Sequence, residues 1–415
     1  MFTPGSKGWI NKYFDLVDRG EIELNIPEIE KEQIAHYLQI KFSNSGVMYG
    51  FPAEFIFCKH IDQSKWTVDE KLKILLFEAL LLIYLIKIPH FKRHEFIESI
   101  QHFYVNHRPN FLQKFLASIL NTKQEQVVET ILTKRISLRG KFNETKFWLL
   151  YAHNVFVYID ILLYRDYITD YKEGTIYSYD DIALNALIVM NLVSAADGVI
   201  DEVEKNLYKL FLVSANLNDQ YYEKAEKLFQ YGAKIKDLKN IGSENQLYRN
   251  FLLNIAFFTL FISHDQIEKE RKVIQKIAKK IGFDTDQILK IEMMVEQFLL
   301  KNAQDLPFVN ARSNTDQMLR SVSKKWLKIL GRNKDKMVIE LKQSKDLIRL
   351  INKSRKEDLT KTEKELVKAQ FKDLIKTVPS LAIFMLPGGA ILLPILSKVL
   401  PDILPSAFKD NEIDN

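Results

Sequence analysis

The sequence has little cysteine, glycine and proline. Cys58 is the only cysteine among 415 residues, so the chain cannot form an internal disulfide. This low cysteine content fits a reducing compartment. Only 14 glycines and 11 prolines are present. Because β-sandwiches and barrels need frequent turns built from these residues, the composition argues against both and favours long helices. The N-terminus also lacks a basic stretch followed by an apolar one, so no cleavable signal peptide is expected.

The motifs of common enzymes are missing as well. The sequence contains no glycine-rich phosphate loop, no dinucleotide-binding fingerprint and no nucleophile elbow. Ser321 and Lys324 have the Ser-x-x-Lys spacing without its companion motifs. His90 and His94 are four residues apart, but the glutamate of zinc proteases is absent, which favours a surface or core role. A buried thiol is the favoured interpretation of Cys58. We therefore expect a non-enzymatic protein.

Hydrophobic periodicity predicts an all-α fold of multi-helical bundles. Leucine and isoleucine recur at three- and four-residue spacings from Leu72 to Ile86, with Thr67 and Glu70 placed as a capping box before them. The apolar stretch from Phe147 to Tyr164 carries Asp160, so we predict a buried helix there rather than a membrane span. Strand-like alternation is nearly absent.

Composition shifts divide the chain into predicted segments. We expect an N-terminal helical domain (residues 1–175), a middle helical domain (180–302), a basic amphipathic arm (315–376), an apolar segment (377–408) and a short tail (409–415).

The positive charge is concentrated before the most apolar run of the chain. Residues 301–376 contain 20 lysines and arginines against 10 acidic residues, whereas the whole chain carries a net charge of only +6. Residues 377–397 then contain no charged residue. Such a run is long enough to cross a hydrocarbon core of about 30 Å, and a polybasic neighbour is attracted to anionic lipid. The pattern predicts a membrane-associating segment with the bulk of the chain on the cytoplasmic side.

Prolines and glycines interrupt this apolar segment and leave its conformation open. A single span, a shallow hairpin of two half-helices and an arm packed on the protein's own core all remain compatible with the sequence. The interrupting residues that we assign to the membrane segment are Pro379, Pro387, Gly388, Gly389, Pro394, Pro401 and Pro405.

The basic arm contains cations that could face anionic lipid headgroups. Its leucine and isoleucine spacing predicts amphipathic helices, which favours a membrane surface or a partner helix over nucleic acid, although Trp326 offers a ring for base stacking. We expect no DNA partner. The candidate contact residues are Lys324, Lys325, Lys328, Arg332, Arg355 and Lys356.

An acidic turn in the middle domain is the one candidate metal site. An apolar helix is predicted to end at Asp197-Gly198, and a new helix to begin at Asp201 with Glu204 three positions later. Capping explains this pattern completely, because Gly198 suits the turn and Asp201 with Glu204 forms a capping box. The alternative is that Asp197, Asp201 and Glu204 bind Ca²⁺ or Mg²⁺ through their oxygens. No other cofactor is expected.

The acidic turn resembles the TerB-like helical domain of tellurite-resistance proteins. The resemblance covers about residues 182–300 and rests on Ala-Ala-Asp-Gly-x-Ile-Asp-x-x-Glu. The family usually has a second acidic helix start, and here its counterpart departs from the pattern at His264, Asp265 and Arg271. The resemblance implies an α-helical fold and a role in ion or stress biology.

Several motifs follow one another in a fixed order near the C-terminus. They are Leu359-Thr-x-x-Glu363, Asp373-Leu, Val378-Pro379, Pro387, Leu392-Leu393-Pro394 and Leu400-Pro401-x-x-Leu404-Pro405-Ser406-x-Phe408. In this arrangement, roughly Ser344–Phe408 resembles the LETM family, the leucine-zipper/EF-hand transmembrane proteins of the mitochondrial inner membrane and their bacterial relatives. The resemblance implies cation homeostasis and ribosome binding, so the basic residues of the arm are also candidate ribosome contacts. Its combination with a TerB-like domain resembles a bacterial LETM-related, biofilm-associated family.

Two departures from the LETM pattern shape the functional prediction. Residues 388–391 lack the acidic residue that family members carry in the apolar segment, which argues against self-contained ion exchange. The chain also extends only seven residues past Phe408, so we expect most of the ribosome-binding domain to have no counterpart.

We therefore predict a membrane-associated scaffold or regulatory protein of the bacterial inner membrane. Its expected partners are anionic lipid and a ribosome, with homo-oligomers as a further form. The alternatives are a soluble TerB-like module that responds to divalent cations, and an oligomeric cation/proton exchanger.

Overall fold

The computed structural model describes most of the chain outside its C-terminal third. The described residues are 2–113, 122–137, 153–169, 178–198, 200, 202–239, 245–262, 267–302, 341 and 344–377. They form two compact units, Met1–Phe283 and Asp284–Asn415. The predicted segment boundaries stay predictions.

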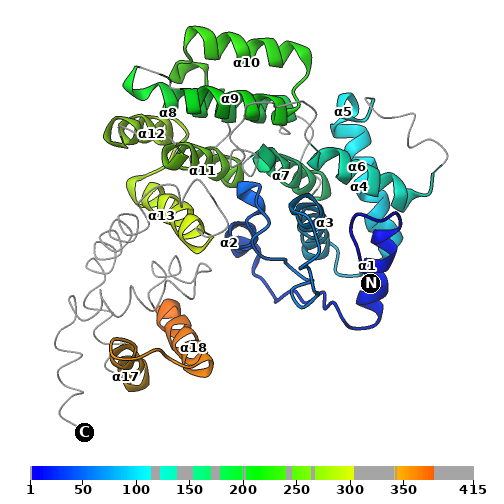
Figure 1. Cartoon of the computed structure of the whole chain (residues 1–415), viewed down its shortest axis with the longest axis vertical. Helices are drawn as coiled ribbons and strands as arrows, with labels where there is room; N and C mark the ends of the chain where they lie inside the picture. Colours follow the sequence, from blue (N-terminus) through cyan, green and yellow to red (C-terminus); the bar gives the residue numbers. More distant parts are fainter. Residues whose placement is uncertain are drawn as a thin grey trace. The chain divides into compact units, whose positions relative to one another are not determined.

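The predicted all-α fold is confirmed, because the described residues form helices and contain no β-strand. Figure 1 shows the helices of the first unit in chain order. Its α-helices are α1 (Trp9–Asp18), α2 (Ile34–Ser45), α3 (Val68–Lys87), α4 (Arg93–His107), α5 (Pro109–Gln113), α6 (Gln124–Ile136), α7 (Val157–Ile168), α8 (Tyr179–Ser194), α9 (Glu202–Ala215), α10 (Asp219–Tyr231), α11 (Gln246–Ile262) and α12 (Ile267–Lys280). Short 3₁₀ helices join them: η1 (Lys31–Gln33), η2 (Val47–Tyr49), η5 (His153–Phe156), η6 (Ala195–Asp197) and η7 (Ile235–Asp237).

Helix α3 is the buried helix that the leucine periodicity predicts. Its core-facing residues are fully enclosed, and α7 and α6 pack against it. The predicted capping box is confirmed: the Thr67 hydroxyl accepts the Glu70 backbone N–H at 3.2 Å, and the Glu70 carboxylate accepts the Thr67 backbone N–H at 2.8 Å. Two orphan N–H groups of the first turn are thereby satisfied.

Glu78 interrupts the apolar sequence of α3 because its carboxylate anchors a neighbouring loop. It accepts the backbone N–H groups of Ile56, Phe57 and Cys58 at 2.7, 3.1 and 2.8 Å, and the Tyr13 hydroxyl at 3.0 Å. Burial raises the pKa of Glu78, and the backbone donors oppose that rise. Burial and the adjacent Glu78 also raise the pKa of the Cys58 thiol, which is buried as expected and is a poor nucleophile.

Helix α7 is buried, as predicted, and the first of its two buried carboxylates, Asp160, is held by two arginines. Asp160 is fully enclosed, accepts Arg108 Nη1 at 2.7 Å and Tyr104 Oη at 3.1 Å, and also accepts Arg135 Nε. Arg135 Nη2 additionally donates to the Tyr179 hydroxyl at 2.9 Å. The network therefore ties α4, α6 and α7 to the first residue of α8.

Helix α8 is the centre of the middle helices. It packs against α11, α10, α9 and α12, and Figure 1 shows α10 as the outer helix beside α9. Among the described residues, one helical stretch, Tyr179–Asp197, is long and apolar enough to cross a membrane, with mean hydropathy 1.2. Because 72% of that window is buried inside the protein, it fits a core helix of the bundle.

The second unit contains α13 (Thr285–Lys301), α17 (Lys345–Ser354) and α18 (Lys361–Thr377). Helix α13 begins with a capping box in which Asp284 and Gln287 exchange hydrogen bonds of 2.8 and 3.0 Å. Helices α17 and α18 pack against each other.

Candidate functional site

Helices α17 and α18 form a hairpin with a small apolar core. Leu347, Ile348, Leu350 and Ile351 of α17 are buried at helical spacing, as the sequence predicts. From the other side, Leu359 lies just before α18, and Val367 and Phe371 follow one turn apart on it; all three are buried. The hairpin therefore has one apolar inner face, formed by these buried side chains.

The corner between the two helices is tied by charged hydrogen bonds. Glu363 accepts the Thr360 backbone N–H at 2.9 Å and its hydroxyl at 3.0 Å, while its own N–H donates to the Thr360 hydroxyl at 3.3 Å. This is the predicted capping box. Lys353 Nζ at the end of α17 reaches the same carboxylate at 2.6 Å. The Lys353 hydrogen bond, together with Thr360, lowers the pKa of Glu363 to about 2.

Exposed cations lie around this fixed corner. Arg355 and Lys356 follow α17 directly and are both exposed, as a contact role requires. Neither makes an ion pair with another described residue. The other exposed cations of the hairpin are Lys345, Arg349, Lys361 and Lys364. Among the side chains described in 344–371, six exposed cations stand against four exposed acidic residues (Asp346, Glu357, Asp358 and Glu365), so the net charge of this surface is positive and suits an anionic partner.

The remaining predicted contact and membrane residues fall outside the described part of the chain. These are Lys324, Lys325, Lys328 and Arg332 of the basic arm, and Pro379, Pro387, Gly388, Gly389, Pro394, Pro401 and Pro405 of the apolar segment. Their roles stay predictions.

The acidic turn of the middle helices has the predicted backbone. Gly198 ends η6 with φ of 94°, a conformation that glycine adopts without strain, and α9 begins at Glu202. Asp197 is half-buried in η6 and Glu204 is buried in α9, whereas Asp201 falls outside the described residues. Both Asp197 and Glu204 interact with other groups of the protein.

Sequence reasoning did not single out a further buried carboxylate of the middle helices, Glu270. Helix α12 packs against η6, and its Glu270 is only 5% exposed. In the TerB-like pattern, the last acidic residue aligns with Arg271, which is the next residue along the chain. Which of these two side chains is buried depends on how α12 is rotated about its own axis. Within the described residues, no three histidine, cysteine or acidic side chains cluster as metal ligands. The proposed Ca²⁺ or Mg²⁺ site at Asp197, Asp201 and Glu204 therefore stays a prediction.

Comparison with known proteins gives one match. No curated protein and no solved structure matches the chain. Residues 359–415 match the family model described as "LETM1-like, RBD", a ribosome-binding domain. The matched part starts at Leu359, the buried residue before α18, and covers the capping box and helix α18. Residues 359–415 therefore have a counterpart in this domain, whereas the expectation that most of the domain has none stays a prediction. The chain carries a LETM-type C-terminal region, as the sequence predicts.

Proposed function

We propose that the protein is a membrane-associated, non-enzymatic scaffold whose LETM-type C-terminal region contacts ribosomes. The observation that carries this proposal is the family match over residues 359–415, which begins at the corner of the α17–α18 hairpin. The hairpin corner presents the exposed cations Arg355 and Lys356 beside a backbone fixed by a capping box and an ion pair. Ribosomal RNA is a dense array of phosphates, for which such a surface is complementary.

The membrane part of the proposal depends on the sequence that follows α18. Residues 377–397 carry no charge and directly follow a segment with a net charge of +10. We place this run in a bacterial inner membrane, with the helical bulk on its cytoplasmic side. The scaffold would then hold ribosomes close to the membrane, in the setting of cation homeostasis and envelope or biofilm formation that the LETM and TerB resemblances imply.

Ribosome co-sedimentation with the full chain tests the proposal at the hairpin corner. We expect the double variant Arg355→Gln/Lys356→Gln to bind ribosomes more weakly than wild type at every salt concentration. Because each lost phosphate contact lowers the slope of log affinity against log salt by about 1, the slope should fall by about 2.

The double variant Lys279→Gln/Lys280→Gln is the matched control. These two adjacent lysines are exposed at the end of α12, so the charge change and its position at a helix end are the same. Its affinity and salt slope should equal those of wild type. Equal losses in both double variants would mean that only net charge matters, and no ribosome binding by the full chain would reject the proposal.

A further inference from the structure

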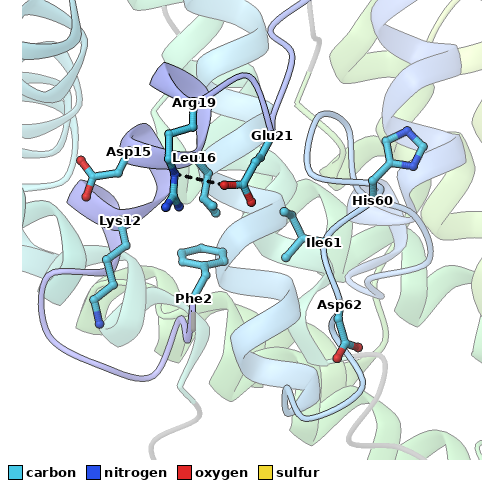
Figure 2. Close-up of a pocket in the computed structure, with 9 residues that line it drawn as sticks. All are labelled: Phe2, Lys12, Asp15, Leu16, Arg19, Glu21, His60, Ile61 and Asp62. Atoms are coloured by element: carbon cyan, nitrogen blue, oxygen red, sulfur yellow. Dashed lines mark ion pairs between the residues drawn. The ribbon is translucent and has the colours of Figure 1, made fainter.

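A cavity of about 600 Å³ opens between α1 and the loop before α3, far along the sequence from the LETM-type region. Figure 2 shows the residues that line it. They come from three separate places: Phe2 from the N-terminal segment, Leu16 and Arg19 from α1 and its end, and Ile61 from the loop. A volume of this size is typical of small-molecule sites, which usually lie between about 300 and 1,000 Å³.

The floor of this cavity is apolar and held in place. Phe2 and Leu16 are only 8% and 6% exposed. The Phe2 ring makes edge-to-face contacts with Trp66, at 5.2 Å between centroids, and with Tyr13 at 6.1 Å. These contacts fix the ring where a ligand would lie, so little side-chain entropy would be lost on binding.

The mouth of the cavity carries two opposite charges side by side. Arg19 Nε lies 3.0 Å from a Glu21 carboxylate oxygen, and Figure 2 shows the pair above the Phe2 ring. The two side chains are 62% and 50% exposed, so this ion pair contributes little stability and can exchange partners at low cost. The α-ammonium and α-carboxylate of an amino acid are also adjacent. Such a headgroup can therefore pair with Glu21 and Arg19 at once.

We propose that this cavity binds a free α-amino acid with an apolar side chain. The ligand carboxylate would pair with Arg19, its ammonium group with Glu21, and its side chain would lie on Phe2, Leu16 and Ile61. Asp62, on the loop, also lines the cavity, and its carboxylate accepts the Ser64 backbone N–H at 3.0 Å. The cavity is a binding site in this proposal and performs no chemistry.

Calorimetric titration of the full chain with single ligands tests this proposal. L-Leucine and L-phenylalanine should bind, whereas glycine should not, because it lacks the apolar group that the floor accepts. N-acetyl-leucine and leucine amide each lack one charge and should bind at least tenfold more weakly than leucine. Leucine amide also represents the N-terminus of a peptide, so equal binding of the amide would overturn the amino-acid assignment in favour of a peptide end.

Variants of the Arg19–Glu21 ion pair provide the second test of this proposal. Arg19→Gln and Glu21→Gln should each weaken leucine binding at least tenfold, without loss of fold by circular dichroism. Lys205→Gln is the matched control, because Lys205 is also exposed and paired with an exposed glutamate, Glu202, at 2.8 Å. Its affinity for leucine should be unchanged. Failure of leucine and phenylalanine to bind wild type up to about 10 mM, or wild-type affinity in both charge-pair variants, would overturn the proposal.

Discussion

At the scale of single residues, two enclosed carboxylates explain why acidic side chains occur inside apolar helices. Glu78 accepts three backbone N–H groups, and Asp160 lies between two arginines. A buried charge without such partners would be unfavourable by several kcal/mol. Both residues are therefore predicted to stabilise the fold and to have no direct role in binding.

Asp160→Asn is expected to destabilise the protein by about 3–5 kcal/mol, because Arg108 and Arg135 would remain buried without a counter-ion. Urea unfolding followed by circular dichroism measures this loss. Glu54→Gln is the control: it removes an exposed partner of Lys59 and should cost less than about 1 kcal/mol. Equal, small effects of both substitutions would contradict the role given to the buried network.

Gly50 is a position where both conformation and space require glycine. Its φ is 68°, and a Cβ there would lie 2.4 Å from the backbone nitrogen of Val155. Gly50→Ala should therefore destabilise the protein by about 3 kcal/mol or more, through strain and forced displacement of backbone.

Gly20→Ala separates the effect of backbone strain from the effect of the steric clash. Gly20 also has a positive φ, of 74°, but an added Cβ would meet no atom within 4 Å. This substitution should cost only about 1 kcal/mol in the same urea titration. A similar cost at both positions would show that the approach of Val155 does not matter.

At the scale of elements, local sequence patterns were sufficient to predict the structure wherever the interacting groups are close in sequence. The capping boxes Thr67–Glu70 and Thr360–Glu363 follow from residues three apart, and the buried face of α17 follows from its periodicity. The partners of Asp160 could not be found this way, because 25 and 52 residues separate it from Arg135 and Arg108. The cavity beside α1 was missed for the same reason.

The link between α17 and α18 predicts an unusual titration of one glutamate. The pKa of Glu363 is lowered from 4.5 to about 2 by Lys353 and Thr360. The pKa of Glu363 is lower in the folded state than in the unfolded state. The Lys353–Glu363 link therefore contributes its full stabilisation of the fold above pH 4.5, and this stabilisation is lost as the pH falls toward 2. Carbon NMR of the carboxyl should find Glu363 ionised where ordinary glutamates are half protonated.

Lys353→Gln checks the cause of this shift. Without the ammonium group, the titration midpoint of Glu363 should rise toward the ordinary glutamate value, while Thr360 continues to hold it partly down. A midpoint that stays near 2 in the variant would mean that the lysine is not responsible.

At the scale of the whole molecule, the sequence was sufficient for the fold class and for the C-terminal relationship. Sparse glycine and proline with helical periodicity predicted the all-α architecture, and the resemblance of the C-terminal motifs to a known family indicated the LETM-type region. The arrangement of the helices could not be predicted, because it depends on contacts such as α3 with α7 and α8 with α11, which join distant segments. The same holds for the burial of Glu270 on α12.

The central claim is that the chain associates with membranes through the apolar segment that follows α18. Liposome flotation on anionic lipid, with the full chain and with a chain truncated after Lys376, tests it most directly. Both should float at low salt, because both keep the basic residues. After a high-salt, alkaline wash, only the full chain should stay with the lipid. Release of both chains by the wash, or no flotation of either, would contradict the account.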